Sequence, residues 1–270
     1  MTVQPSRTAL AERIARAGHD WLAPDWGAWC DASVGAFATT RHGGVSSGAR
    51  ASLDLALAGD GGSAARDENL RRVAMFLPAP PVLLRQVHGR DVITLDRGSV
   101  AAARVAPPVA DAAVTAVPGV VCAVLAADCL PVLFADRDGR AVGAAHAGWR
   151  GLAAGVLEAT VAALAQLGVP ASRLAVWLGP AIGPAAFEVG VDVVSAFCAQ
   201  DAAAASAFVA CSAGKWRADL YALARRRLAA AGVARASGGT HCTFSEGDRF
   251  FSFRRDREAG RQGAFIWRYR

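Results

Sequence analysis

Val120-Val121-Cys122-Ala123-Val124-Leu125-Ala126-Ala127 is an unbroken apolar run that ends at Asp128. Its length and its β-branched residues predict a strand buried on both faces. Two further apolar runs, 131–135 and 140–147, flank the sequence Asp136-Arg137-Asp138-Gly139. An Asp-Gly pair between apolar runs is the strongest short-range signal for a hairpin. The whole stretch therefore predicts three strands, with the second and third joined by a tight turn.

The predicted hairpin brings a thiol toward an imidazole. A two-residue turn at Asp138-Gly139 places Cys129 opposite Gly148, and His146 is then the diagonal neighbour of the cysteine on the same face. The prediction depends on the register, because a slip of one residue turns the two side chains apart. Pro131, which cannot donate to a strand ladder, marks the place where a break would occur.

A helix is predicted directly after the third strand, following Gly148-Trp149-Arg150-Gly151. Its apolar positions follow i, i+4 spacing, and they are Leu152, Val156, Leu157, Val161, Leu164 and Leu167. Gly168 and Pro170 are stop signals. The predicted site thus lies near a helix N-terminus, where free N–H groups and the dipole favour an anion, and Arg150 adds positive charge.

Composition bounds the class of protein. The chain has 270 residues, 53% hydrophobic content and seven tryptophans, enough for one large domain or for two tightly fused halves. Lys215 is the one lysine among the 29 basic residues, so Schiff-base chemistry is not expected. The sequence also contains no Walker-type phosphate loop. A net charge of +6 suits small anionic substrates. The arginines are scattered without an RNA-binding or zinc-finger pattern, so nucleic acid is not an expected partner.

The sequence carries no recognisable secretion or membrane signal. Residues 1–20 mix charged and apolar side chains, and no uncharged apolar run reaches about 18 residues. A cytosolic location without a membrane partner is the expectation. Six cysteines at irregular spacing are interpreted as reduced thiols rather than as a disulfide framework.

The rest of the chain predicts a mixture of helices and strands. Helices are expected at 10–17, at 67–76 with Asp67 as its cap, at 192–198 and at 218–231, strands at 34–40, 82–89 and 174–178, and a terminal hairpin at 250–256 with 264–267. Because strands alternate with helices and hairpins also occur, mixed sheets flanked by helices are expected rather than a purely parallel sheet.

Two of the five histidines, His88 and His146, end apolar runs, and Cys129 lies at the end of another. Together they supply two imidazoles and one thiolate, a ligand set for catalytic zinc that leaves a fourth position for water or substrate. The same residues admit a second chemistry, in which Cys129 is a nucleophile, either histidine is its base and Asp128 orients that base. They also match the His₂Cys set of blue copper, although a multicopper oxidase needs more imidazoles than this chain has.

Two segments offer groups for an anion. Arg41 precedes Gly43-Gly44 in a tight turn with exposed backbone N–H groups, although such glycine turns are also common without a ligand. The run 82–89 presents Arg85 and Gln86 at its end.

Several motifs together are similar to those of a known family. They are Thr39-Thr40-Arg41 with Gly43-Gly44-Val45-Ser46, Arg85-Gln86-Val87-His88-Gly89, Asp111 with Thr115, Ala127-Asp128-Cys129, His146-Ala147-Gly148-Trp149-Arg150-Gly151, Gly179-Pro180-Ala181-Ile182-Gly183, Phe187-Glu188-Val189, His241-Cys242-Thr243 and Phe250-Phe251-Ser252-Phe253-Arg254-Arg255-Asp256 with Gly260-Arg261. On these residues the chain resembles the YfiH-type laccase-domain family. The resemblance implies one α+β domain over 34–270, with 1–33 packed on it as an extension. It also implies a four-layer α/β/β/α arrangement of mixed sheets between helices.

The resemblance also implies a zinc ion held by His88, Cys129 and His146, with copper as the alternative metal. Members of the family are described as purine nucleoside phosphorylases with adenosine deaminase activity, as copper-dependent polyphenol oxidases, and as a cytosolic amidase that edits peptidoglycan precursors. The leading hypothesis is zinc-dependent phosphorolysis of adenosine, inosine or methylthioadenosine, with nucleoside and phosphate as the partners. The alternatives are the oxidase, an amidase that uses Cys129, and a non-enzymatic protein in which the metal is purely structural. No oligomeric state is predicted.

The leading hypothesis assigns two groups of residues. The catalytic group is Cys129, His88, His146 and Asp128, and the group that binds substrate or phosphate is Arg41, Arg85, Gln86 and Arg150. One departure from the family pattern is Asp54, where asparagine is expected, and it affects the predicted substrate contacts of that loop.

Overall fold

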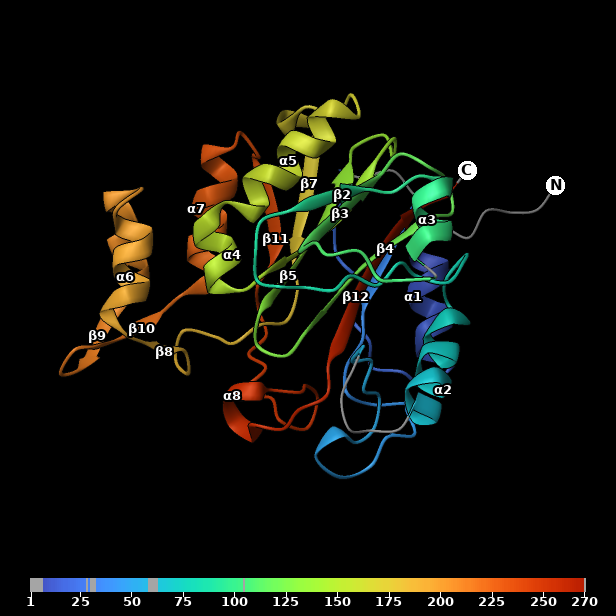
Figure 1. The fold of residues 1–270 in the computed structure, drawn as a ribbon, viewed down its shortest axis with the longest axis horizontal. Coiled ribbons are helices and arrows are strands. Elements are labelled where there is room, and N and C mark those ends of the chain that lie inside the picture. The colour runs from blue at the N-terminus through green and yellow to red at the C-terminus, as the bar shows by residue number, and fades with distance from the viewer. Residues whose placement is uncertain (1–6, 28, 30–32, 58–62, 104, 270) are drawn as a thin grey trace.

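The computed structural model describes residues 7–27, 29, 33–57, 63–103 and 105–269. In this part of the chain two β-sheets pack face to face, and helices cover their outer faces (Figure 1). The apolar residues that separate the two sheets form one of the main cores of the molecule.

The larger sheet has six strands in the order β11-β7-β5-β6-β3-β2. Their bounds are Arg235–Gly238 for β11, Leu174–Leu178 for β7, Leu130–Asp136 for β5, Val142–Ala147 for β6, Ala112–Thr115 for β3 and Val92–Thr94 for β2. The sheet is mixed, because β11 pairs in parallel with β7 and β2 with β3, while the other pairs are antiparallel. Its central strands are buried along their whole length, as expected for a sheet covered on both faces.

The smaller sheet is antiparallel and has the order β1-β12-β4. Its strands are Val34–Ala38 for β1, Gln262–Arg268 for β12 and Val121–Ala126 for β4. Side chains alternate between the two faces of each sheet. In β5, Phe134 faces the outer helices, whereas Leu133 packs between the sheets, together with Val124 of β4 and Ile266 of β12.

Helices form the two outer layers. The bounds are Trp149–Ala154 for α4, Val156–Gln166 for α5 and Leu220–Ala230 for α7, which pack on the larger sheet, and Arg7–Arg16 for α1 and Ser63–Ala74 for α2, which pack on the smaller sheet. The predicted α+β class and its four-layer α/β/β/α arrangement are therefore confirmed.

Several smaller elements complete the fold. They are α3 (Arg97–Ala103), α6 (Val191–Cys198), α8 (Phe253–Asp256), a three-stranded sheet of β8 (Glu188–Val189), β10 (Lys215–Ala218) and β9 (Phe208–Ser212), and the 3₁₀ turns Gly48–Arg50, Ala171–Arg173 and Ala202–Ala207. The sheet of β8, β10 and β9 extends from one side of the molecule together with α6 (Figure 1). In the described part of the chain, no helix combines the length and the apolar character needed to cross a bilayer.

The predicted hairpin is confirmed in its register. Leu130 pairs with Ala147 and Val132 with Ala145, which is the alignment set by a two-residue turn at Asp138-Gly139. Pro131 pairs with His146 inside the ladder, and β5 continues through it without a break. Cys129 and His146 consequently share one face.

Two predicted elements around the hairpin are wrong. The helix expected from 152 to 167 is divided, because Gly155 has a left-handed backbone (φ 97°) that ends α4 and starts α5 in a new direction. The segment 82–89 forms only isolated bridges, at Val82 and at Arg85. Its last N–H groups donate to a carboxylate instead of to a neighbouring strand.

The predicted terminal hairpin and the cap of the second helix are also wrong. Ser252 Oγ accepts a hydrogen bond from the Arg255 N–H, so the chain turns into α8 where a strand was expected. β12 pairs with β1 and β4 instead. Asp67 lies inside α2, which begins at Ser63.

Replacing Leu133 with alanine tests the packing between the sheets. The side chain is fully buried there, so Leu133→Ala should lower the free energy of unfolding by about 2–5 kcal/mol through lost burial and a cavity. Met75→Ala removes a side chain of similar size that is 58% exposed and should cost less than about 0.5 kcal/mol. Urea denaturation followed by circular dichroism measures both, and equal losses would contradict the described core.

Candidate metal centre and active-site cavity

The site lies where the chain passes from one sheet to the other. β4 of the smaller sheet ends at Ala126, β5 of the larger sheet begins at Leu130, and Cys129 lies in the crossing between them. Asp128 in this crossing has a left-handed backbone (φ 83°), an uncommon conformation for a residue with a side chain. His88 shares this feature (φ 61°). Strained backbone of this kind is concentrated at functional sites and persists only where surrounding bonds hold it.

Hydrogen bonds hold the crossing in place. The Asp128 carboxylate accepts a hydrogen bond from Thr243 Oγ1 at 2.6 Å and another from the Arg254 backbone N–H at 2.6 Å. Both carboxylate oxygens are thus engaged with the C-terminal segment. The predicted catalytic Asp128 does line the cavity, but its hydrogen bonds tie Arg254, in the first turn of α8, to the residue next to Cys129.

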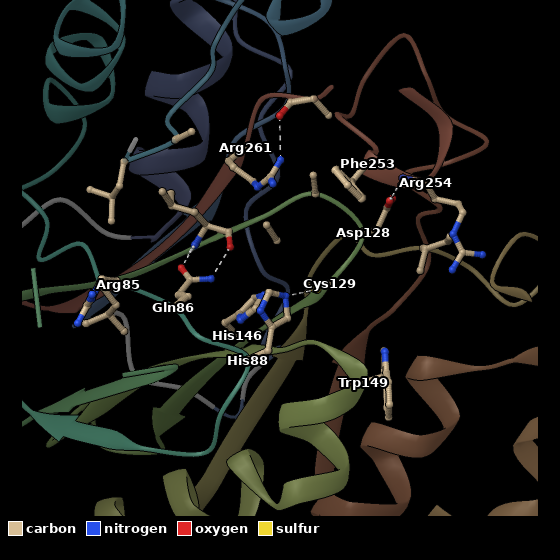
Figure 2. A pocket seen from close by; sticks show the side chains of 18 of the residues that line it. Arg85, Gln86, His88, Asp128, Cys129, His146, Trp149, Phe253, Arg254 and Arg261 are labelled. Carbon is tan, nitrogen blue, oxygen red and sulfur yellow. Dashed lines mark hydrogen bonds between the residues drawn. The ribbon is translucent and has the colours of Figure 1, made fainter. Parts of the chain in front are cut away.

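Three side chains converge at this crossing, as the hairpin register predicts for two of them. The ligand atoms of His88, Cys129 and His146 all lie within 4.8 Å of one another, and Cys129 Sγ is 3.7 Å from His88 Nε2 (Figure 2). His146 is buried, Cys129 is half-buried and His88 is exposed. The cluster is therefore closed on the side of the core and open toward the cavity.

Asp111, which belongs to one of the family motifs but had no predicted role, organises this cluster. Its fully buried carboxylate accepts hydrogen bonds from His146 Nδ1 at 2.9 Å and from the backbone N–H groups of Val87, His88 and Gly89 at 3.2, 2.9 and 2.7 Å. Burial favours a higher pKa for Asp111, but the hydrogen bonds from His146 and the backbone outweigh it and lower the pKa. The carboxylate fixes the tautomer of His146 and leaves its Nε2 for a ligand.

The donor set fits a zinc ion. Tetrahedral coordination with Zn–N and Zn–S bonds of about 2.0–2.3 Å places ligand atoms about 3.3–3.8 Å apart, close to the separation of Cys129 and His88. A histidine whose second nitrogen donates to a carboxylate is the usual arrangement around catalytic zinc. Three protein ligands leave one position facing the cavity.

Gly148 gives the cluster room. A methyl group at this position would lie 2.9 Å from Cys129 Sγ and 2.9 Å from His88 Cδ2, closer than either atom tolerates. Glycine at this position, directly after β6, lets the thiol and the imidazole approach each other.

Cys129 and His146 form a charged pair when no metal is present. Burial favours a higher pKa for the Cys129 thiol, but attraction to His146 and hydrogen bonds with His146 and His88 lower that pKa to about 6. Burial in turn favours a lower pKa for His146, but the Cys129 thiolate and the Asp111 carboxylate raise it to about 9. The thiolate is therefore the predominant form at neutral pH, which is the form that binds a metal or attacks a substrate.

A cavity of about 580 Å³ opens above the cluster. Its polar wall includes four arginines, Arg50, Arg85, Arg254 and Arg261, and its apolar wall includes Trp149, Phe187 and Phe253. Of the predicted binding residues, Arg85 and Gln86 line this cavity. The Gln86 amide, however, donates to the Leu125 carbonyl and accepts from the Leu125 N–H, so it clamps the loop to β4.

The other two predicted binding arginines lie outside this cavity. Arg41 donates to the carbonyls of Ala51 and Gly247 and stacks over the Phe251 ring. Arg150 is exposed and lies over the Trp149 ring at 4.5 Å. The structure instead brings Arg254 and Arg261 to the cavity, and the resemblance had marked both only as parts of motifs.

The remaining histidines have other surroundings. His19 stacks on Trp21, His42 contacts Asp20 and His241 contacts Glu246. Among the described residues, the cluster of His88, Cys129 and His146 is the single group of metal-ligand side chains that come together. These three residues could hold one metal ion.

The chain combines a mixed four-layer fold with a cluster of three side chains that could hold one metal ion beneath an arginine-lined cavity. Comparison with known proteins identifies the family: the chain belongs to the family described as Multi-copper polyphenol oxidoreductase laccase, which it matches over residues 35–269.

The relatives in this family carry a common name. The chain is 51% identical to "Purine nucleoside phosphorylase PA4543" of Pseudomonas aeruginosa, covering 92% of this chain and 98% of that protein. It is 52% identical to "Purine nucleoside phosphorylase YfiH" of Escherichia coli K12, covering 87% and 93%. Among solved structures, Neisseria meningitidis protein NMB0706 matches with a TM-score of 0.86 at 46% identity, covering 93% of this chain and all of that one.

Substitution of Asp111 tests how the metal centre is oriented. Asp111→Asn places an NH₂ group against N–H donors and should weaken zinc binding about 10- to 100-fold. Competition with a chromogenic chelator measures the affinity. Asp136→Asn is the matched control, since this buried carboxylate pairs with Arg140 and Arg173 at the other end of β5. Asp136→Asn should reduce stability and leave zinc affinity unchanged. If Asp111→Asn binds zinc as tightly as the parent protein does, the role assigned to Asp111 is wrong.

Alkylation of the metal-free protein tests the charged pair. The rate at which iodoacetamide modifies Cys129 should rise through about pH 6 and level off near neutrality, because the thiolate is the reactive form. His146→Ala removes the largest influence that lowers this pKa, so the midpoint should move up toward about 8.5. Peptide mapping identifies the cysteine, and buried Cys122, whose pKa is raised, should stay unmodified. Zinc should protect Cys129, and an unshifted midpoint in the His146 variant would exclude the pair.

Proposed function

We propose that this protein is a zinc-dependent purine nucleoside phosphorylase that accepts adenosine and inosine and also deaminates adenosine. The observation that carries the proposal is the His88, Cys129 and His146 cluster at the base of a cavity lined by arginines and aromatic rings. A purine nucleoside needs flat apolar surface, and its co-substrate phosphate needs guanidinium groups. The names of the relatives support the phosphorylase activity.

Phosphorolysis exchanges one bond at the ribose. A phosphate oxygen bonds to C1′, the bond from C1′ to the purine nitrogen breaks, and its electron pair leaves with the base, which takes up a proton. The products are the free base and ribose-1-phosphate. Zinc bound at the cluster supplies an electrophile that polarises a substrate oxygen or acidifies a water molecule.

The residues of the chain position the reactants. Trp149, Phe187 and Phe253 offer apolar rings to the nucleoside, and Arg85 adds positive charge at the rim of the cavity. The crossing at Asp128 and the turn at His88 are held by hydrogen bonds before substrate arrives, so little reorganisation accompanies binding. Deamination of adenosine uses the same cavity, with water adding to the carbon that bears the amino group and ammonia leaving.

The number of imidazoles weighs against a multicopper oxidase. Two of the five histidines of the chain meet at the cluster, and the other three have the separate partners described above. Several copper ions would need further ligands.

A second candidate is an amidase that acts on a peptidoglycan precursor, and the lowered pKa of Cys129 favours it. In that reaction the Cys129 thiolate bonds to the amide carbon, the amine leaves with a proton, and water then releases the acyl group. Hydrolysis of this kind needs no phosphate.

Product analysis distinguishes the two. Zinc-loaded protein incubated with inosine and phosphate should release hypoxanthine and ribose-1-phosphate, and with adenosine also ammonia, measured by chromatography. Cys129→Ala and His88→Ala should fall to the level of a buffer blank, because each removes a metal ligand. Cys211→Ala changes an exposed cysteine in β9 and should keep parental activity. Base release that equals the Cys129→Ala level, or that is indifferent to phosphate, would reject phosphorolysis.

A further inference from the structure

The motif His241-Cys242-Thr243 takes no part in the chemistry described above. Thr243 is fully buried and is not among the described residues that line the cavity, so it does not meet a substrate. Its hydroxyl nevertheless donates to the Asp128 carboxylate at 2.6 Å, and Asp128 directly precedes Cys129. Thr243 therefore reaches the metal cluster through one intervening residue.

Every polar group of Thr243 is engaged in a hydrogen bond. Its N–H donates to the Ala181 carbonyl at 3.0 Å, and its carbonyl accepts from Arg255 Nη1 at 2.7 Å. Its β-branched side chain also has few rotamers. With the backbone fixed on both sides, the hydroxyl is a rigid donor that extends toward the crossing between the two sheets.

Tyr221, in α7, anchors the segment that carries Thr243. Its hydroxyl donates to the His241 carbonyl at 2.6 Å and accepts from the Ala181 N–H at 2.8 Å. Ala181 is also the residue whose carbonyl accepts from the Thr243 N–H. Tyr221 is 5% exposed, so both hydrogen bonds lie away from water, where losing a partner is costly. One hydroxyl thus joins the two segments on which Thr243 rests.

The crossing needs this support because Asp128 has a left-handed backbone. Such a conformation is unfavourable for a residue with a side chain and persists only where surrounding bonds impose it. Oδ1 accepts from Thr243 Oγ1, Oδ2 from the Arg254 N–H, and the carbonyl from the Ile182 N–H at 3.0 Å. Of these three bonds, the one from Thr243 is donated by a side chain, so a substitution can remove it without altering the backbone.

We propose that Thr243, anchored by Tyr221, is a positioning residue that aligns the Cys129 thiol for metal binding. The charge-assisted hydrogen bond from its hydroxyl holds the Asp128 carboxylate, which is 9% exposed, and without this donor the carboxylate turns toward solvent. The crossing then relaxes toward an ordinary backbone conformation and carries Cys129 Sγ away from the two histidines. The hydroxyl acts on the direction of one metal ligand and not on the substrate.

Conservative variants test the hydroxyl by itself. Thr243→Val keeps the shape of the side chain and removes the donor, and it should weaken zinc binding about 2- to 30-fold, the range for a residue that acts through a neighbour. Thr243→Ser keeps the hydroxyl and should retain parental affinity. Competition with a chromogenic chelator measures the affinity of each folded protein.

Thr115→Val is the matched control. Thr115 is also fully buried, and its hydroxyl donates to the Leu95 carbonyl at 2.7 Å, at the end of β3 that is remote from Asp111. This variant should lose stability and keep parental zinc affinity. Cobalt(II) provides a second readout, because the thiolate-to-cobalt charge-transfer band should shift or weaken in Thr243→Val and remain parental in Thr115→Val.

Tyr221→Phe tests the anchor and is an independent variant. It should weaken zinc binding in the same direction as Thr243→Val but to a smaller extent. Because Tyr221 acts through Thr243, the double variant should bind zinc about as tightly as Thr243→Val alone, whereas independent effects would add.

Three outcomes overturn the assignment: parental zinc affinity in folded Thr243→Val, an equal loss in Thr243→Ser or Thr115→Val, and additive losses in the double variant. Where Thr243→Val does not fold, parental zinc affinity in Tyr221→Phe overturns it. These measurements use no nucleoside, so their result is independent of the proposed function.

Discussion

The Asp111 carboxylate is a full negative charge with no exposure to solvent, and such a group is tolerated only when donors surround it. Three consecutive backbone N–H groups and the His146 imidazole meet that requirement. The same four bonds draw the His88 turn, which is far away in the sequence, against strand β6. The candidate metal centre depends on this interaction, because it fixes the position of His88 and leaves Nε2 of His146 for a ligand.

A second buried carboxylate ties the metal centre to the substrate cavity. Asp128 lies in the crossing between the two sheets, next to Cys129, and its oxygens hold Thr243 and the backbone of Arg254. A shift of the C-terminal segment would therefore be felt at the thiol. In this protein the acids of the site act mainly as acceptors that set backbone positions.

The fold explains why these groups meet. The larger sheet carries His146 on β6, and strand β4 of the smaller sheet ends at Ala126, just before Cys129. The C-terminal segment before β12 lines the cavity from the other side. Residues from distant parts of the chain converge because the two sheets pack face to face and the chain passes between them at one edge of the site (Figure 1).

The sequence by itself determined the local parts of this arrangement. The apolar runs, the Asp138-Gly139 turn and the two-residue period of strands were enough for the hairpin, its register and the approach of Cys129 to His146. These signals act over a few residues, so they can be read without the fold. Local signals did not predict the left-handed break at Gly155 or the helix α8 in place of a terminal strand. At both places the local sequence allows more than one structure, and tertiary packing selects one of them.

Only the tertiary structure decided which charged residues line the cavity. Arg41 and Arg150 lie in promising local sequence but point to other partners, whereas Arg254 and Arg261 reach the cavity because Asp128 and Asp54 hold their backbones. The role of Asp111 could not be predicted from local sequence either, because its carboxylate accepts hydrogen bonds from donors 22 to 35 positions away along the chain. Long-range hydrogen bonds leave no periodic trace in a sequence, and in this protein they are what places the site.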